Sequence, residues 1–194
     1  MANANTALGL WPERKVSGQP WSGAGNIYYI PSSDANNYYL GDPLIPTGAA
    51  DANGIPVVQL ATAGASNYVL GPMVGIVNGG EPIIPVTRDL PIYRQASVSQ
   101  YILVMDDPEM LFSIQENGNM GAGAAWSNAN LVSGTGSTVT GYSGWQLNSS
   151  SSATTATLQL RVLTPLRQSN NAVGTNAKWL VRINLHALVG TTGY

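Results

Sequence analysis

The acidic residues between positions 106 and 116 form the only cluster in the sequence whose types and spacing could do chemistry. The cluster consists of Asp106, Asp107, Glu109 and Glu116. Paired carboxylates hydrolyse glycosides when they lie about 5–9 Å apart, and carboxylate oxygens also bind calcium. The spacing does not match a calcium-binding loop, in which acids alternate around a central glycine. We therefore interpret the cluster as a solvated hairpin turn and keep a surface calcium site as the alternative.

The single histidine, His186, is the second group with possible chemistry. A serine-nucleophile mechanism needs a histidine that lies beside a serine and is oriented by an acid. His186 instead falls on the polar face of a predicted strand with Lys178 and Arg182, and no Gly-x-Ser-x-Gly motif occurs. The glycine-rich segments 121–125 and 134–137 lack the following helix and the lysine of a phosphate-binding loop. We therefore predict that the protein is not an enzyme and needs no cofactor or metal.

Tryptophan and tyrosine are over-represented among the aromatic residues. The chain has 5 tryptophans and 9 tyrosines but only 1 phenylalanine. Both side chains suit half-buried positions and are enriched at the anchor points of protein–protein interfaces. The candidate interface residues are Trp11, Trp21, Trp126 and Trp145. For Trp126 and Trp145, stacking on sugar rings in a lectin-like loop is the alternative.

Residues 1–25 are expected to form an extended N-terminal arm. Trp11 and Trp21 lie there in a segment rich in proline and glycine, before the first clear strand. A core built from 194 residues does not need this segment, so we expect it to reach neighbouring subunits. Docking onto the parent domain and disorder are the alternatives.

The composition excludes several classes of function. Charged residues make up 9% of the chain, against about 25% in ordinary soluble domains. The formal net charge of −2 offers no basic surface for nucleic acid, and the absence of cysteine excludes disulfides and thiolate metal sites. No apolar run approaches about 18 residues, and the N-terminus lacks the features of a signal peptide. We therefore expect no nucleic-acid or membrane partner, and synthesis in the cytoplasm.

The elements that must position these residues are predicted to be strands. Short aromatic and β-branched runs at 26–31, 37–44, 55–61 and 68–77 are separated by turn signals. Their spacing of about ten residues is typical of a small barrel or sandwich. The apolar run at 98–105 predicts a further, fully buried strand.

Two antiparallel pairs are predicted in the second half of the chain. Residues 110–116 are expected to form a hairpin with 98–105, because the intervening Asp-Asp-Pro-Glu fits a type I turn. A helix capped by Asp107 is the alternative for this segment. Segments 154–163 and 178–187 alternate apolar and polar residues, which indicates two strands with one buried face each.

Residues 117–152 are rich in Gly, Ser, Thr and Asn. This composition predicts a long loop, or short strands with wide turns, that Trp126, Tyr142 and Trp145 must anchor against the entropy of ordering it. The complete expectation is an all-β fold, with the arm 1–25 followed by one domain over 26–194. We expect a small antiparallel β-barrel or β-sandwich that carries residues 117–152 as a long insertion.

Two long segments, 52–80 and 117–160, contain no charged residue. A surface with so little charge gains little protection against association. Either other subunits cover much of it, or it is the solvent face of a β-protein with small polar side chains.

Several segments resemble tailed-bacteriophage capsid decoration (cement) proteins and other phage structural proteins. They read Ile-Tyr-Tyr-Ile-Pro-Ser-Ser at 27–33, Tyr-Tyr-Leu-Gly-Asp-Pro-Leu at 38–44 and Gly-Pro-Met-Val-Gly-Ile-Val at 71–77, and continue at 101–116 and 176–184. The resemblance implies a non-enzymatic virion component on the outer surface of the major capsid shell. It implies no catalytic residue.

This resemblance and the composition lead to one expected function. We expect a capsid decoration protein whose partners are the major capsid protein and copies of itself, as a homotrimer or homodimer. By binding only the assembled shell, it would lower the free energy of the shell relative to separated capsomers. The alternatives are another virion component, in the tail, neck or fibre, and a carbohydrate-binding β module.

Overall fold

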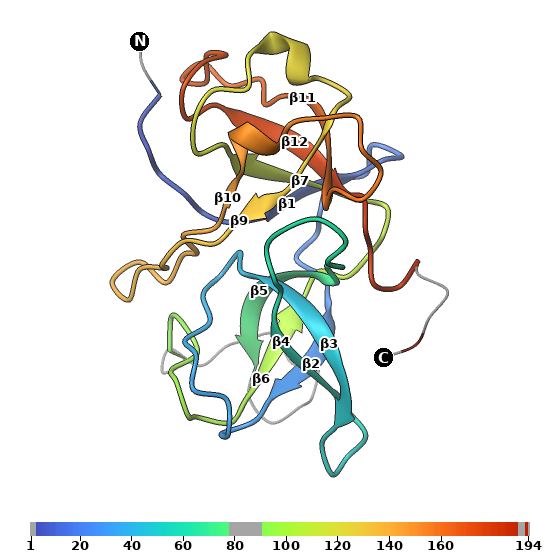
Figure 1. Ribbon diagram of the computed structural model, residues 1–194. Helices are drawn as coiled ribbons and strands as arrows, with labels where there is room; N and C mark the ends of the chain where they lie inside the picture. Colours follow the sequence, from blue (N-terminus) through green and yellow to red (C-terminus); the bar gives the residue numbers. More distant parts are fainter. Residues whose placement is uncertain (1–2, 78–90, 190–192, 194) are drawn as a thin grey trace.

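The computed structural model describes residues 3–77, 91–189 and 193. These residues form β-strands and two short 3-10 turns, which confirms the predicted all-β fold. The strands build two regions that lie one above the other in Figure 1. We call them the barrel, which closes on itself, and the sheet region, which contains a five-stranded sheet.

The barrel is formed by strands from the first half of the chain. They are β2 (Asn26–Ile30), β3 (Pro43–Ala50), β4 (Pro56–Leu60), β5 (Gly71–Val77) and β6 (Gln100–Val104). The barrel closes in the order β2-β4-β3-β5-β6. Its pairings are antiparallel apart from the parallel contact between β2 and β4, where Tyr29 is the partner of Val57. Apolar side chains such as Ile30, Leu44 and Ile102 fill the interior.

The sheet region combines the second half of the chain with one N-terminal strand. Its five-stranded sheet contains β1 (Trp11–Lys15), β7 (Met110–Gln115), β12 (Lys178–Ile183), β11 (Leu160–Pro165) and β8 (Asn128–Ala129), in that order. A separate pair, β9 (Leu131–Val132) and β10 (Gln146–Leu147), packs on one face, with the 3-10 turns η1 (Ala122–Ala124) and η2 (Ser149–Ser151) nearby. The sheet region therefore has its own apolar core, centred on Phe112, Trp179 and Val181.

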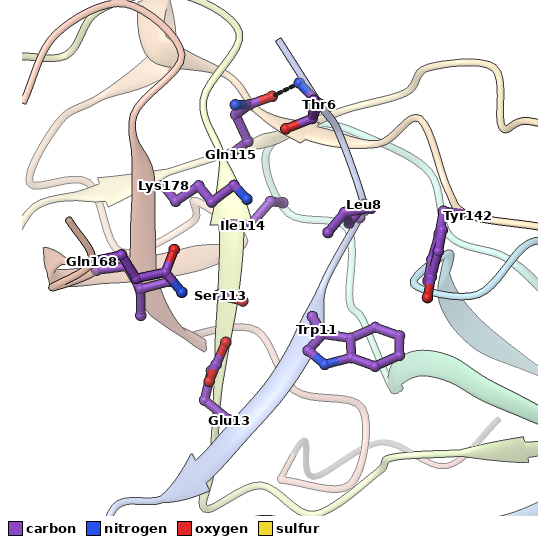
Figure 2. A pocket seen from close by; sticks show the side chains of 12 residues that line it. Thr6, Leu8, Trp11, Glu13, Ser113, Ile114, Gln115, Tyr142, Gln168 and Lys178 are labelled. Atoms are coloured by element: carbon purple, nitrogen blue, oxygen red, sulfur yellow. Dashed lines mark hydrogen bonds between the residues drawn. The ribbon is translucent and has the colours of Figure 1, made fainter. Parts of the chain in front are cut away.

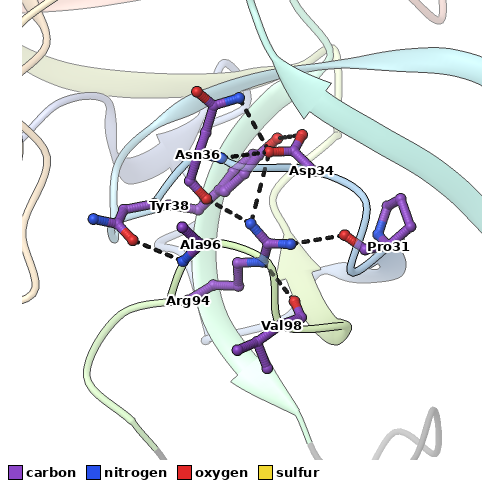
Figure 3. A network of polar contacts seen from close by, with 8 residues as sticks. Pro31, Asp34, Asn36, Tyr38, Arg94, Ala96 and Val98 are labelled. Atoms are coloured by element: carbon purple, nitrogen blue, oxygen red, sulfur yellow. Dashed lines mark hydrogen bonds and ion pairs between the residues drawn. The ribbon is translucent and has the colours of Figure 1, made fainter.

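A buried arginine closes one end of the barrel (Figure 3). The guanidinium group of Arg94 donates to three carbonyl oxygens, those of Pro31, Asn36 and Val98, at 2.5–2.8 Å. It also lies 3.7 Å from the carboxylate of Asp34 and stands over the ring of Tyr38. Carbonyls from two loops thus meet on one side chain, which holds those loops together.

Two glycines form the joint between the barrel and the N-terminal segment. The amide of Leu10 donates to the carbonyl of Gly41 at 2.9 Å. A Cβ atom on Gly41 would lie 2.0 Å from the carbonyl oxygen of Leu8, and one on Gly9 would lie 2.2 Å from the Gly41 oxygen. Both glycines also have positive φ, so only glycine fits at this crossing of the backbone.

The hairpin predicted between 98–105 and 110–116 is wrong, although both segments are strands. β6 pairs with β2 and β5 in the barrel, whereas β7 pairs with β1 and β12 in the sheet. Residues 106–109 therefore pass from one region to the other. The reason is that β7 lies between β1 and β12 in the five-stranded sheet, so the backbone groups on both of its edges are already paired. The alternative of a helix is wrong for the same segment.

The second half of the chain contains the predicted pair of strands and the predicted insertion. Strands β11 and β12 pair antiparallel as predicted, with Val162 opposite Val181, although β11 begins at Leu160 because the residues before it form turns. Residues 117–152 form short strands and wide turns.

The predicted N-terminal arm, residues 1–25, contains a strand of the sheet. Residues 1–2 of the arm lie outside the described residues, and β1 is an edge strand docked on β7. This arrangement corresponds to the alternative in which the segment docks onto its own domain.

Candidate functional site

The acidic cluster predicted at 106–116 does not assemble. The buried carboxylate of Asp106 accepts hydrogen bonds from Asn26 and Tyr28, which raises the pKa of Tyr28 in addition to the larger effect of burial. Glu116 is also buried and accepts from the amide of Met120. Neither residue belongs to a solvated turn, so that interpretation is wrong for both.

The remaining two acids of this segment form separate ion pairs. Asp107 lies 2.9 Å from the amino group of Lys15, which holds the pKa of its carboxyl below the usual range. Glu109 lies 2.7 Å from a guanidinium nitrogen of Arg182. Among the described residues, no three His, Cys, Asp or Glu side chains are placed to hold a metal ion.

His186 does not lie on a wet strand face, because β12 ends at Ile183 and the chain turns inward after it. Its side chain is 4% exposed, and its backbone forms a bridge with Val69 at the boundary of the barrel. Burial lowers the pKa of His186 to about 4. The imidazole is therefore neutral at pH 7, and no serine hydroxyl donates to it within the described residues.

The structure separates the four candidate tryptophans into three environments. Trp11 and Trp21 are half buried and meet edge to face, with ring centroids 6.0 Å apart. Tyr142 packs against Trp11 in the same way, at 5.9 Å, so the insertion is anchored on β1. Trp145 is only 5% exposed and belongs to the core of the sheet region. Trp126 is 72% exposed.

Trp126 is exposed on a rigid support. Its amide donates to the carbonyl of Val162, and the amide of Val162 donates to the carbonyl of Ser127. These bonds continue the pairing of β8 with β11, so Trp126 stands at the outer edge of the sheet. Its φ angle is +68°, a conformation that costs a non-glycine residue about 1 kcal/mol or more. The exposed tryptophan is thus held against its own conformational preference.

A groove lies between the N-terminal segment and the centre of the sheet (Figure 2). It encloses about 420 Å³ and is bordered by Trp11, Glu13, Tyr142 and Lys178. Gln115 at its upper end accepts from the amide of Thr6 and donates to the carbonyl of Ala4, so it fixes the N-terminal segment. The groove combines an aromatic wall with one acidic and one basic side chain.

The face of the sheet that carries this groove also carries several basic residues. Arg14 and Arg182 are both register partners of Leu111, and Arg161 is the partner of Arg182. Three arginines therefore lie in one row across β1, β12 and β11, since directly paired residues share a face. Sequence reasoning missed this row because it depends on the pairing of β7 with β1 and β12, which the predicted hairpin excluded.

The candidate interaction surface is therefore the outer face and β8 edge of the five-stranded sheet, marked by Trp126, the groove and the arginine row. Within the described residues, no helix is long and apolar enough to cross a membrane. Comparison of the chain with protein-family models, curated proteins and solved structures finds no match.

Proposed function

We propose that the protein is a non-enzymatic structural component of a virus particle that attaches to the outer surface of the major capsid shell and stabilises it. The observation that carries the proposal is Trp126, a large aromatic side chain that backbone hydrogen bonds hold in solvent at a strained φ angle. Exposed aromatic residues on rigid supports are typical anchors of protein–protein interfaces. The resemblance to phage decoration proteins supplies the identity of the partner.

The mechanism would be stabilisation by linkage. A ligand that binds the assembled shell and not its separated subunits lowers the free energy of the shell. Rigid β-structure suits this role because little conformational entropy is lost on binding. Symmetric repetition over the shell, with contacts between copies as a homotrimer or homodimer, would add avidity to a modest single contact.

The test is co-sedimentation with empty shells assembled from the major capsid protein of the virus that encodes the chain. The wild-type protein should pellet with shells in a saturable way, and shells should then melt at a higher temperature. Trp126→Ala should weaken binding by about tenfold or more, the loss typical of an interface anchor. Val139→Ser is the matched control, because Val139 is 85% exposed on the insertion and away from the sheet edge.

Two results would contradict the proposal. Wild-type protein that stays in the supernatant at every shell concentration would exclude attachment to the shell. Equal binding by Trp126→Ala and the wild type would remove the role of the anchor. Imaging of particles would separate the shell from a place in the tail, neck or fibre.

Trp126 also favours a second candidate, a carbohydrate-binding module. An exposed indole offers the flat apolar face on which sugar rings stack. The expected partnership with Trp145 is wrong, because Trp145 is buried. A single exposed indole would give weak binding of the protein to a glycan array, and Trp126→Ala should abolish that binding. An array without signal for the wild-type protein would exclude this candidate.

A further inference from the structure

A second hollow opens beside the arginine row, where β11 and β12 meet the residues that follow β12, up to Val189. It encloses about 310 Å³. Its lining residues are Pro108, Arg161, Arg182, Ile183, Asn184, His186 and Val189. Among the described residues, two arginines and His186 line it and no carboxylate does. The hollow is therefore rich in hydrogen-bond donors.

The two arginines of this hollow are direct cross-strand partners. Arg161 on β11 lies opposite Arg182 on β12, on the same face of the sheet. Like charges in this arrangement repel one another and destabilise the pair of strands. Glu109 offsets the charge of Arg182 through an ion pair, but it is the only acid paired with either arginine among the described residues. Arg161 therefore has no ion pair among the described residues, although the carboxylates of Asp106 and Asp107 also act on His186.

Several donors of these arginines remain free in the part of the chain that the structure describes. Arg161 uses Nε to donate to the side chain of Asn128, and its terminal nitrogens have no partner there. Arg182 donates from Nε to the carbonyl of Pro108 and from Nη2 to Glu109, which leaves Nη1. Planar guanidinium groups with free terminal nitrogens are suited to bind the oxygens of carboxylates and phosphates.

His186 provides the second, independent observation. Its Nδ1 accepts a hydrogen bond from the amide of Leu188, so in the neutral ring the proton lies on Nε2. Nε2 is buried and has no hydrogen-bond partner among the described residues. A buried donor without a partner costs free energy, and such groups are rare in folded proteins. A bound ligand with an acceptor oxygen would remove this cost.

We propose that the hollow between Arg161, Arg182 and His186 is an oxyanion-binding site, which takes a carboxylate or a phosphate group. The oxyanion would lie between the two guanidinium groups and relieve their repulsion. His186 would add a neutral donor at the buried end, either directly or through one water molecule. This site is separate from the Trp126 anchor, and it can exist whether or not the protein binds a capsid shell.

The experiment is a titration followed by NMR at constant ionic strength. Because the chain contains 1 histidine, the imidazole of His186 gives one unambiguous set of signals. Inorganic phosphate, acetate and chloride are added separately to the full chain at pH 7. We expect saturable shifts of the His186 signals with phosphate, acetate or both, and none with chloride. The stronger of the two arms identifies the source as a phosphate or a carboxylate group.

Variants test whether the arginine pair holds the anion. Arg161→Gln should weaken binding by about tenfold or more, since a hydrogen-bonded charge is lost. Arg161→Lys, which keeps the charge but loses the planar fork, should weaken it less. Arg167→Gln is the matched control: it also removes one arginine charge, and Arg167 lines a different hollow. Circular dichroism verifies that each variant is folded.

Three results would overturn the proposal. Shifts that grow linearly and equally with all three anions would mean screening by salt and no site. Saturable binding that Arg161→Gln and Arg167→Gln reduce equally would mean attraction to the general positive charge. Saturable binding that leaves the His186 signals unmoved would place the anion elsewhere on the molecule.

Discussion

The barrel and the sheet region differ in the environment of their arginines. In the barrel, Arg94 is buried and bonded to carbonyls, and Asp34 and Tyr38 complete the network around it. In the sheet region, Arg161 and Arg182 face outward and keep free donors. The difference teaches that the arginine of the first region stabilises the fold, whereas two arginines of the second region keep donors available for contacts. The predictions below test this division.

The largest expected effect is the loss of Arg94. Arg94→Leu leaves the carbonyls of Asn36 and Val98 without a donor and the carboxylate of Asp34 without its cation. It should therefore lower the free energy of unfolding by about 3 kcal/mol or more. Urea unfolding measures it. Arg167→Leu, on the sheet region, should cost less than about 0.5 kcal/mol. Equal effects of the two variants would refute the contrast between the regions.

The joint between the barrel and the N-terminal segment should be the next most sensitive position. A methyl group on Gly41 collides with the carbonyl of Leu8, so Gly41→Ala should cost about 2–3 kcal/mol, more than backbone strain alone. Gly54→Ala is the control, because Gly54 also has positive φ but no atom lies within 4 Å of its Cβ position. Thermal melts compare the two variants, and similar losses would show that the crossing is not tightly packed.

Asp42 and His186 should give opposite dependences of stability on pH. Burial raises the pKa of Asp42 to about 6, against hydrogen bonds from Ser143 and the amide of Tyr39. The folded state therefore holds this proton more tightly, and the associated stability is present below pH 4 and lost as the pH rises to about 6. Burial lowers the pKa of His186 to about 4, with Arg182 acting in the same direction and Asp106 and Asp107 opposing it. The stability that neutral His186 contributes to the fold is therefore present above pH 6.5 and is lost as the pH falls to about 4.

Variants separate these two contributions. Relative to the wild type, Asp42→Asn should gain stability by about 2 kcal/mol between pH 4 and 6, as the cost of ionising the buried acid disappears. His186→Gln should change in the reverse direction over the same interval. Asp51→Asn is the control, because the lowered pKa of Asp51 confines its effect to pH below about 4. Unfolding in urea at several pH values gives the curves, and parallel curves for all variants would contradict the pKa shifts.

The smallest effect on stability is expected at Trp126. Trp126→Ala removes an exposed side chain and should change the free energy of unfolding by less than about 0.5 kcal/mol. Trp126→Gly should be more stable than Trp126→Ala by up to about 1 kcal/mol, because glycine adopts positive φ without strain. Thermal melts distinguish them. A large loss of stability in Trp126→Ala would mean that the side chain of Trp126 stabilises the fold.

Sequence reasoning succeeded where the pattern of side chains is local. The alternation at 178–187 predicted β12, and the run IPVVQLA predicted β4, because strand periodicity is visible within a few residues. Sequence reasoning failed where residues far apart in the chain determine which strands pair. Met110–Gln115 has the local pattern of the second strand of a hairpin, but it pairs with β1 and β12.

The candidate site was only partly predictable for the same reason. Composition selected Trp126 and Trp145 equally, and only the packing of the sheet region buries one and exposes the other. The row formed by Arg14, Arg182 and Arg161 has no signature in the sequence, since it arises from register across strands far apart in the chain.

The most direct test of the central claim is hydrogen exchange of the protein bound to capsid shells, compared with the free protein. The sheet region should be the contact region, so amides of 122–129 and 160–165 should exchange more slowly in the bound state. Amides of the barrel, such as those of β3 and β4, should be unchanged. Protection confined to the barrel, or equal exchange in bound and free protein, would contradict the account.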